Sequence, residues 1–140
     1  MNRYLFSEIA VGHTESFIVS ITDEKMADFH SITGDCNPMH TDDHFAQQGR
    51  GNYKGRIVYG MLTASLISTL AGVYLPGENS LIQKVDVEFP APVYVGDVLT
   101  VIGEVIRKDE NFNIIEVKVT IRNEHGDKVC RGKTRIGVLK

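Results

Sequence analysis

The sequence has 140 residues, of which 42% are hydrophobic and 24% are charged, and its formal net charge is −3 at pH 7. These values are typical of one soluble globular domain, residues 1–140, that can bury a sizeable core. Charges of both signs are spread along the chain, and the absence of a lysine or arginine run argues against nucleic acid or an anionic membrane as a partner. The two cysteines, Cys36 and Cys130, form no CxxC pair, so we expect neither a disulfide framework nor a zinc site. The N-terminus lacks the long apolar run of a signal peptide, and we therefore expect a cytoplasmic protein.

The first elements expected along the chain are one strand and two short helices. Alternating hydrophobic side chains predict a strand at residues 16–21. Thr22 can then cap a helix whose first turn is acidic, and Gly34 is a natural stop for it. A second short helix is expected after Thr41, with two aspartates in its first turn, and it should run to about Gln48.

The middle of the chain is expected to contain a loop and one long helix. The stretch 49–55 is polar and rich in glycine, which predicts a loop. Residues 57–75 are mostly apolar, and the length of this run raises the question of a membrane span. Polar residues spread along the run argue against a span, so we expect a helix buried in the protein core that ends at Pro76-Gly77.

After residue 77 the hydrophobic pattern changes to a period of two, which predicts strands separated by turns. The four expected strands lie at residues 84–89, 98–106, 115–121 and 128–138. Helices gathered ahead of a run of antiparallel strands indicate an α+β domain. The economical arrangement is one curved sheet wrapped around the long helix.

The densest group of reactive side chains lies just beyond the end of the first helix. Asp35 and His40 are five residues apart, and between them Pro38 restricts its own backbone and that of Asn37. A carboxylate and a neutral imidazole that face one water molecule can polarise it and exchange protons with it. A plainer interpretation is that Asp35 caps a backbone turn and that His40 is solvated, and the residues alone leave both open.

Two further readings concern a metal ion and a helix end. His40 and His44 lie four residues apart with Cys36 nearby, a spacing that can ligate zinc, but no HExxH motif is present and we expect no metal. If the long helix begins near Gly60, its first free N–H groups and its positive end lie there and can stabilise an oxyanion. Alternatively, Gly60 serves only to let the helix pack closely on the sheet.

Three segments resemble one known family. The run Phe-His-Ser-Ile-Thr-Gly-Asp-Cys-Asn-Pro-Met-His at residues 29–40, followed by Ala46, resembles the hydratase-2 motif of MaoC-like dehydratases, which include the (R)-specific enoyl-CoA hydratases. Residues 55–62 resemble the start of that family's central helix, and residues 89–97 resemble its later strand–turn segment. The resemblance covers nearly all of the chain. It implies a single hotdog domain that pairs with a second copy through its sheet, as a homodimer or as part of a higher homo-oligomer.

The resemblance also implies roles for individual residues. Asp35 and His40 would be the catalytic pair, and Gly60 would supply the N–H of the oxyanion hole. Ser68 falls where a supporting serine hydrogen-bonds the catalytic aspartate. The remaining implied roles are turn shaping by Asn37 and substrate contact by Tyr59 and Met61. The sequence departs from the family at Tyr59, where histidine often precedes the Gly-Met pair.

The expected activity is reversible hydration of a trans-2-enoyl-CoA to the (R)-3-hydroxyacyl-CoA. Neither a metal nor a redox cofactor is expected, because coenzyme A or acyl carrier protein arrives as part of the substrate. Two alternatives stay open: a hotdog thioesterase, which would direct water to the carbonyl carbon, and a non-catalytic module that binds acyl thioesters. The acyl chain length, the carrier and the pathway are left open by the sequence.

Overall fold

The computed structural model describes residues 1–49 and 51–139 of the chain. Its helices are α1 (Asp23–Thr33), α2 (Pro38–Thr41), α3 (Asp43–Gln48) and α4 (Gly60–Thr69), and a π-helical turn, Leu70–Tyr74, continues α4. Its strands are β1 (Thr14–Ser20), β2 (Ser80–Glu88), β3 (Val98–Asp109), β4 (Ile114–Arg122) and β5 (Lys128–Val138).

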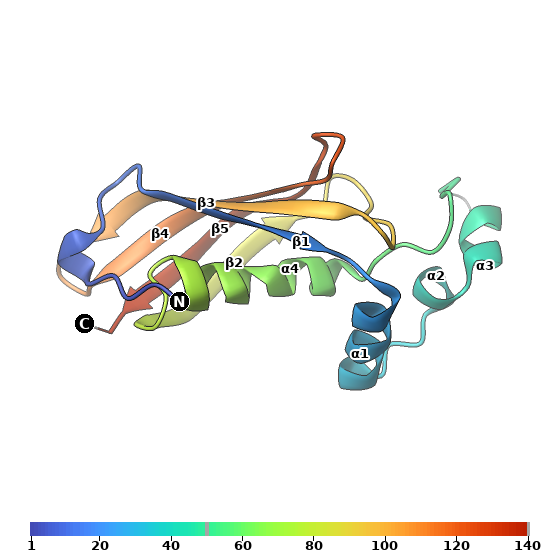
Figure 1. The fold of residues 1–140 in the computed structure, drawn as a ribbon, viewed down its shortest axis with the longest axis horizontal. Coiled ribbons are helices and arrows are strands. Elements are labelled where there is room, and N and C mark those ends of the chain that lie inside the picture. The colour runs from blue at the N-terminus through green and yellow to red at the C-terminus, as the bar shows by residue number, and fades with distance from the viewer. Residues whose placement is uncertain (50, 140) are drawn as a thin grey trace.

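The five strands form one antiparallel sheet in the order β1-β3-β4-β5-β2, so β1 and β2 are its edges. Helix α4 runs along one face of this sheet, and α1, α2 and α3 lie beyond its N-terminal end (Figure 1). Residues of the π-helical turn pack directly on the strands: a Cβ added at Gly103 of β3 would lie 2.8 Å from Leu70 Cδ2. The predicted α+β arrangement of a sheet around a long helix is confirmed.

The ends of the first helix follow from its local sequence. The Thr22 side chain accepts the N–H of Lys25 at 3.2 Å, and Gly34 ends α1 in the left-handed conformation with φ of 72°. The start of the next helix and the presence of a further short helix differ from the prediction. Asp42 caps α3 through the N–H of Phe45 at 3.0 Å and is not part of its first turn, and the additional helix α2 precedes it.

The long helix begins three residues later than the apolar run suggested. Ile57 pairs with Tyr94, and the N–H of Val58 donates to the Val93 carbonyl at 2.7 Å, so this stretch is extended. One side of α4 is also more open than expected, because Met61 and Ser68 are exposed. Every helix in the described part of the chain is too short or too polar to cross a lipid bilayer.

Candidate active site

The three short helices are fastened to the segment that leads into α4. The N–H of Arg56 donates to Asp43 Oδ1 at 2.8 Å, at the start of α3. The Arg56 guanidinium also pairs with Asp23, in the first turn of α1. A single arginine therefore fixes α1 and α3 relative to the start of the central helix.

The turn that follows α1 holds Asp35 through a chain of short-range hydrogen bonds. Its N–H donates to Thr33 Oγ1 at 3.2 Å, and its Oδ1 accepts the N–H of Asn37 at 3.0 Å. The side chain of Asn37 in turn accepts the N–H of Met39 at 3.0 Å and caps α2. Asp35 thus orders a turn, as the plainer interpretation expected, while its side chain also lines a cavity.

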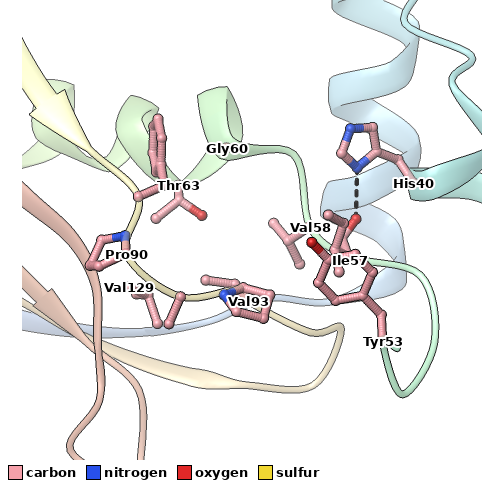
Figure 2. A pocket seen from close by; sticks show the side chains of 12 residues that line it. His40, Tyr53, Ile57, Val58, Gly60, Thr63, Pro90, Val93 and Val129 are labelled. Atoms are coloured by element: carbon pink, nitrogen blue, oxygen red, sulfur yellow. Dashed lines mark hydrogen bonds between the residues drawn. The ribbon is translucent and has the colours of Figure 1, made fainter. Parts of the chain in front are cut away.

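His40 is held in one orientation by the segment before α4. Its Nδ1 lies 2.8 Å from the carbonyl oxygen of Ile57, and Figure 2 shows this contact as a dashed line. Because a carbonyl oxygen can only accept, Nδ1 carries the proton, and in the neutral ring Nε2 keeps its lone pair. The half-buried imidazole is therefore set to receive a proton at Nε2.

Tyr59 packs beneath both of these residues and is only 2% exposed. Its hydroxyl donates to the backbone carbonyl of Asp35 at 2.9 Å, and its ring centroid lies 4.2 Å from that of His40 and 5.0 Å from that of Phe29. Burial, and then the negative charge of Asp35, raise the pKa of the phenol. A neutral phenol can keep donating to Asp35, so the main contacts of Tyr59 are with the turn and the imidazole.

Helix α4 begins at Gly60 with free backbone donors. The N–H groups of Leu62 and Thr63 both reach the Tyr59 carbonyl, at 3.0 and 3.2 Å. In the described residues nothing accepts the N–H of Gly60 or of Met61, as is usual for the first turn of a helix. A Cβ added at Gly60 would lie 3.5 Å from the ring of Phe89. The free N–H groups carry the positive end of the helix dipole.

Two adjoining cavities meet at His40, Gly60 and Phe89. The first has a volume of about 400 Å³ and is also lined by Phe29, Thr33, Asp35, Tyr59 and Met61. The second, about 290 Å³, extends between α4 and residues 90–93 as far as Val129 of β5 (Figure 2). The structure therefore brings Asp35, His40 and Gly60 together around one space.

Ser68 does not join this group within one chain. It is exposed on α4, eight residues or about 12 Å along the helix axis from Gly60. None of the hydrogen bonds among the described residues links it to Asp35. The expectation that it lies beneath the turn of Asp35 is wrong for the single chain, because that turn packs beyond the N-terminal end of α4 (Figure 1).

Sequence reasoning missed Phe89 and Thr63 as lining residues. Phe89 lies just after β2, and only the three-dimensional arrangement brings it to the start of α4. Thr63 could have been found from the sequence, because it is a polar residue near the start of an apolar helix. The residues that the structure describes contain no group of three or more histidine, cysteine, aspartate or glutamate side chains suited to hold a metal ion.

Comparisons with known proteins show that the chain is similar to members of one family. The sequence profile of the family described as MaoC like domain matches residues 11–126. A 3-hydroxybutyryl-CoA dehydratase from Methylorubrum extorquens is 39% identical over 100 residues, which make up 71% of this chain and 62% of that relative. An (R)-specific enoyl-CoA hydratase from Aeromonas caviae is 35% identical over 109 residues, 78% of this chain and 80% of the relative. The match thus spans less than two thirds of the Methylorubrum protein.

The fold has solved counterparts. An unliganded R-hydratase from Pseudomonas aeruginosa matches with a TM-score of 0.88 and 30% sequence identity, covering 96% of this chain and 84% of that chain. The hotdog fold expected from the sequence is confirmed.

Proposed function

The chain belongs to the MaoC-like domain family, and on that premise we propose that it adds water to a trans-2-enoyl thioester to give the (R)-3-hydroxyacyl thioester, and catalyses the reverse dehydration. Two relatives, an (R)-specific enoyl-CoA hydratase and a 3-hydroxybutyryl-CoA dehydratase, are named for hydration and for dehydration, the two directions of such a reaction. Both relatives exceed 30% identity over more than two thirds of this chain.

The observation that carries the proposal is the fixed tautomer of His40. With Nδ1 bound to the Ile57 carbonyl at 2.8 Å, Nε2 of the neutral ring can act as a base without any rearrangement. This nitrogen belongs to a side chain that lines the same cavity as the Asp35 carboxylate and the start of α4. A base, a carboxylate and an oxyanion site around one space are the groups that hydration of an enoyl thioester requires.

In the proposed reaction, Asp35 and His40 hold one water molecule. His40 removes a proton as the water oxygen bonds to the β-carbon, and electron density moves through the double bond onto the thioester oxygen. The free N–H of Gly60, at the positive end of α4, stabilises that oxygen. A proton delivered to the α-carbon from the Asp35–His40 pair then completes the hydroxyacyl product.

The remaining parts of the proposal concern substrate and assembly. The substrate is a thioester of coenzyme A or acyl carrier protein, and no further cofactor takes part. Tyr59 acts as a positioning residue for the catalytic turn, Asn37 shapes that turn, and exposed Met61 borders the space that the substrate occupies. The chain assembles as a homodimer through its sheet.

A hydration assay with crotonyl-CoA tests the proposal. We expect loss of the enoyl absorbance, no release of free thiol, and a product of the R configuration by chiral analysis. Release of free thiol with the double bond intact would instead identify a thioesterase. Binding of crotonyl-CoA without either change would identify a non-catalytic module and reject the proposal.

A further inference from the structure

Thr63 carries a buried hydroxyl without a partner. The residue is 1% exposed, and no hydrogen bond to its Oγ1 exists among the described residues. Threonine in a helix commonly bonds the carbonyl one turn back, but that carbonyl, Tyr59, already accepts the N–H groups of Leu62 and Thr63. Buried hydroxyls nearly always have a partner, so an unpaired one calls for an explanation.

Thr63 is one of the residues that line the second cavity. Figure 2 shows Thr63 on the inner side of α4, facing the space bounded by Val93 and Val129. Valine would have nearly the same shape and would avoid the cost of burying an unpaired hydroxyl. The polar side chain is therefore matched to something that enters this cavity.

The acyl chain is the part of the substrate that reaches Thr63. The walls of this cavity include Val58, Val93 and Val129, all buried, so it leads into the interior. The coenzyme A nucleotide is charged and has to stay in solvent, and only the acyl chain can occupy a buried end. Thr63 also follows Gly60 by three residues, about 4.5 Å along the axis, which places its hydroxyl a few carbons beyond the thioester carbonyl.

We propose that the acyl pocket selects enoyl thioesters whose chain carries a neutral oxygen, as a hydroxyl or carbonyl group, at C4 or C5. This inference rests on the proposed hydration at Asp35 and His40. The Thr63 hydroxyl can donate to such an oxygen or accept from it. A purely apolar chain displaces any water from the pocket and leaves the hydroxyl unpaired, which penalises that substrate. None of the described residues lining this cavity is a lysine or arginine, so a carboxylate on the chain would lack a counter-charge.

Two matched pairs of substrates test the inference, each pair differing by a hydroxyl in place of a methyl group. They are trans-4-hydroxy-2-butenoyl-CoA against trans-2-pentenoyl-CoA, and trans-5-hydroxy-2-pentenoyl-CoA against trans-2-hexenoyl-CoA. In the unaltered protein, kcat/KM should favour the hydroxylated member of at least one pair. Thr63→Val should lower that preference about tenfold, and Thr63→Ser, which keeps the hydroxyl, should retain most of it.

Measuring the binding of the saturated analogues, 4-hydroxybutanoyl-CoA and pentanoyl-CoA, tests this inference independently of the proposed reaction. Calorimetry should show the same preference and the same loss in Thr63→Val, whether or not the enzyme turns over. An unchanged preference in Thr63→Val overturns the inference, even if crotonyl-CoA is hydrated. If Thr63→Val lowers kcat/KM or affinity equally for both members of each pair, the inference is also overturned, because the hydroxyl would then contact the thioester or pantetheine portion.

Discussion

The hydroxyl of Tyr59 donates a hydrogen bond to the backbone carbonyl oxygen of Asp35 at 2.9 Å. The same ring lies 4.2 Å from the imidazole of His40, so one buried side chain contacts both residues of the proposed catalytic pair. At this position the sequence departs from the pattern of the family it resembles. The contacts show how a tyrosine can occupy the site without disturbing the pair: its polar end holds the turn, and its ring supports the imidazole.

Removing only the Tyr59 hydroxyl tests this positioning role. Tyr59→Phe should keep the ring contacts but free the turn of Asp35, and kcat should fall by about three- to tenfold, the worth of one hydrogen bond. KM should change little, because the hydroxyl contacts the protein. Tyr74→Phe is the matched control, since Tyr74 stacks on Phe17 away from the site. Equal kcat values in both variants would show that the hydrogen bond to Asp35 has no role in positioning.

The catalytic pair gives the largest expected effects. Asp35→Asn keeps an oxygen that can accept the N–H of Asn37, so the turn should survive while the charge is lost. His40→Ala removes the proposed base. Each variant should remain folded by circular dichroism and lose about 10²- to 10⁴-fold in kcat. The double variant should lose far less than the product of the two single losses, because both groups act on one water molecule. Near-normal hydration of crotonyl-CoA by either single variant would contradict the assignment.

Much of the fold and part of the site could be predicted from local sequence. Thr22 and Gly34 mark the ends of α1 through hydrogen bonds and backbone conformations that depend on a few neighbouring residues. The hydrophobic pattern after residue 77, alternating in three strands and nearly continuous in residues 98–106, predicted all four later strands because it reflects which parts of the sheet are buried. The turn between Asp35 and His40 could also be predicted, because its hydrogen bonds join residues that are close together in the sequence.

The rest depended on contacts between distant segments. The apolar run begins at residue 57, but α4 begins only at Gly60 because the N–H of Val58 donates to the Val93 carbonyl, a partner that no local pattern indicates. The spacing of Ser68 along the helix indicates the direction in which its side chain points, but it does not indicate which segment of the chain packs against that side of the helix. The orientation of His40 depends on the Ile57 carbonyl, seventeen residues away. Local propensity cannot supply any of these three relationships.

Adding a methyl group at Gly60 tests the oxyanion site. In Gly60→Ala the new Cβ would lie 3.5 Å from the Phe89 ring, an ordinary contact, so the melting temperature should hold. The same Cβ projects into the space next to the free N–H, and kcat should drop by at least tenfold as the thioester oxygen is held away. Gly72→Ala is the control, because its Cβ would meet only Ser80 Oγ at 3.8 Å. A Gly60→Ala enzyme as active as the Gly72→Ala enzyme would place the oxyanion site elsewhere.

Glu116 on β4 should make the free energy of unfolding depend on pH in the acidic range. Its carboxylate accepts from Lys133 Nζ at 2.8 Å and lies 3.3 Å from Arg107 Nε. The hydrogen bond from Lys133 is the main cause that lowers the pKa of Glu116 below its ordinary 4.5. The stabilisation is therefore present above that value and is lost as the pH falls through the lower, folded-state pKa.

Replacing the carboxylate tests this dependence. Glu116→Gln should reduce the free energy of unfolding by about 0.2–1 kcal/mol at pH 7, measured by urea denaturation. The difference from the unaltered protein should shrink below pH 4.5, where the unfolded-state carboxylate becomes protonated. Glu110→Gln is the control, because the Glu110 side chain is far more exposed and lies 3.9 Å from Lys108. A difference that stays constant down to pH 3 would rule out the ionised pair as its source.

The edge strand β2 should join a second copy of the chain. Its outer side has no partner strand in the described residues, and a long unpaired edge with apolar side chains favours association. A register shift between Ile82 and Lys84 sets Ile82 opposite buried Ile136 and Val85 opposite buried Thr134. Both apolar side chains therefore face the side of the sheet on which α4 lies, although they are three positions apart in the sequence. Val85 is still 44% exposed there, which indicates that one chain leaves this part of the face uncovered.

Light scattering should give a mass of twice 15.6 kDa at micromolar concentration. Val85→Lys puts a charge at the expected interface and should shift the protein toward the monomer, because an unpaired charge is costly to bury. Ile106→Lys is the matched control: Ile106 is 41% exposed, but β3 is paired on both sides, so the dimer should persist. A monomer for the unaltered chain would refute the assembly, whereas a stable Val85→Lys dimer would refute only pairing through β2. If Val85→Lys loses both the dimer and the hydration activity while Ile106→Lys keeps both, the active site depends on the second copy.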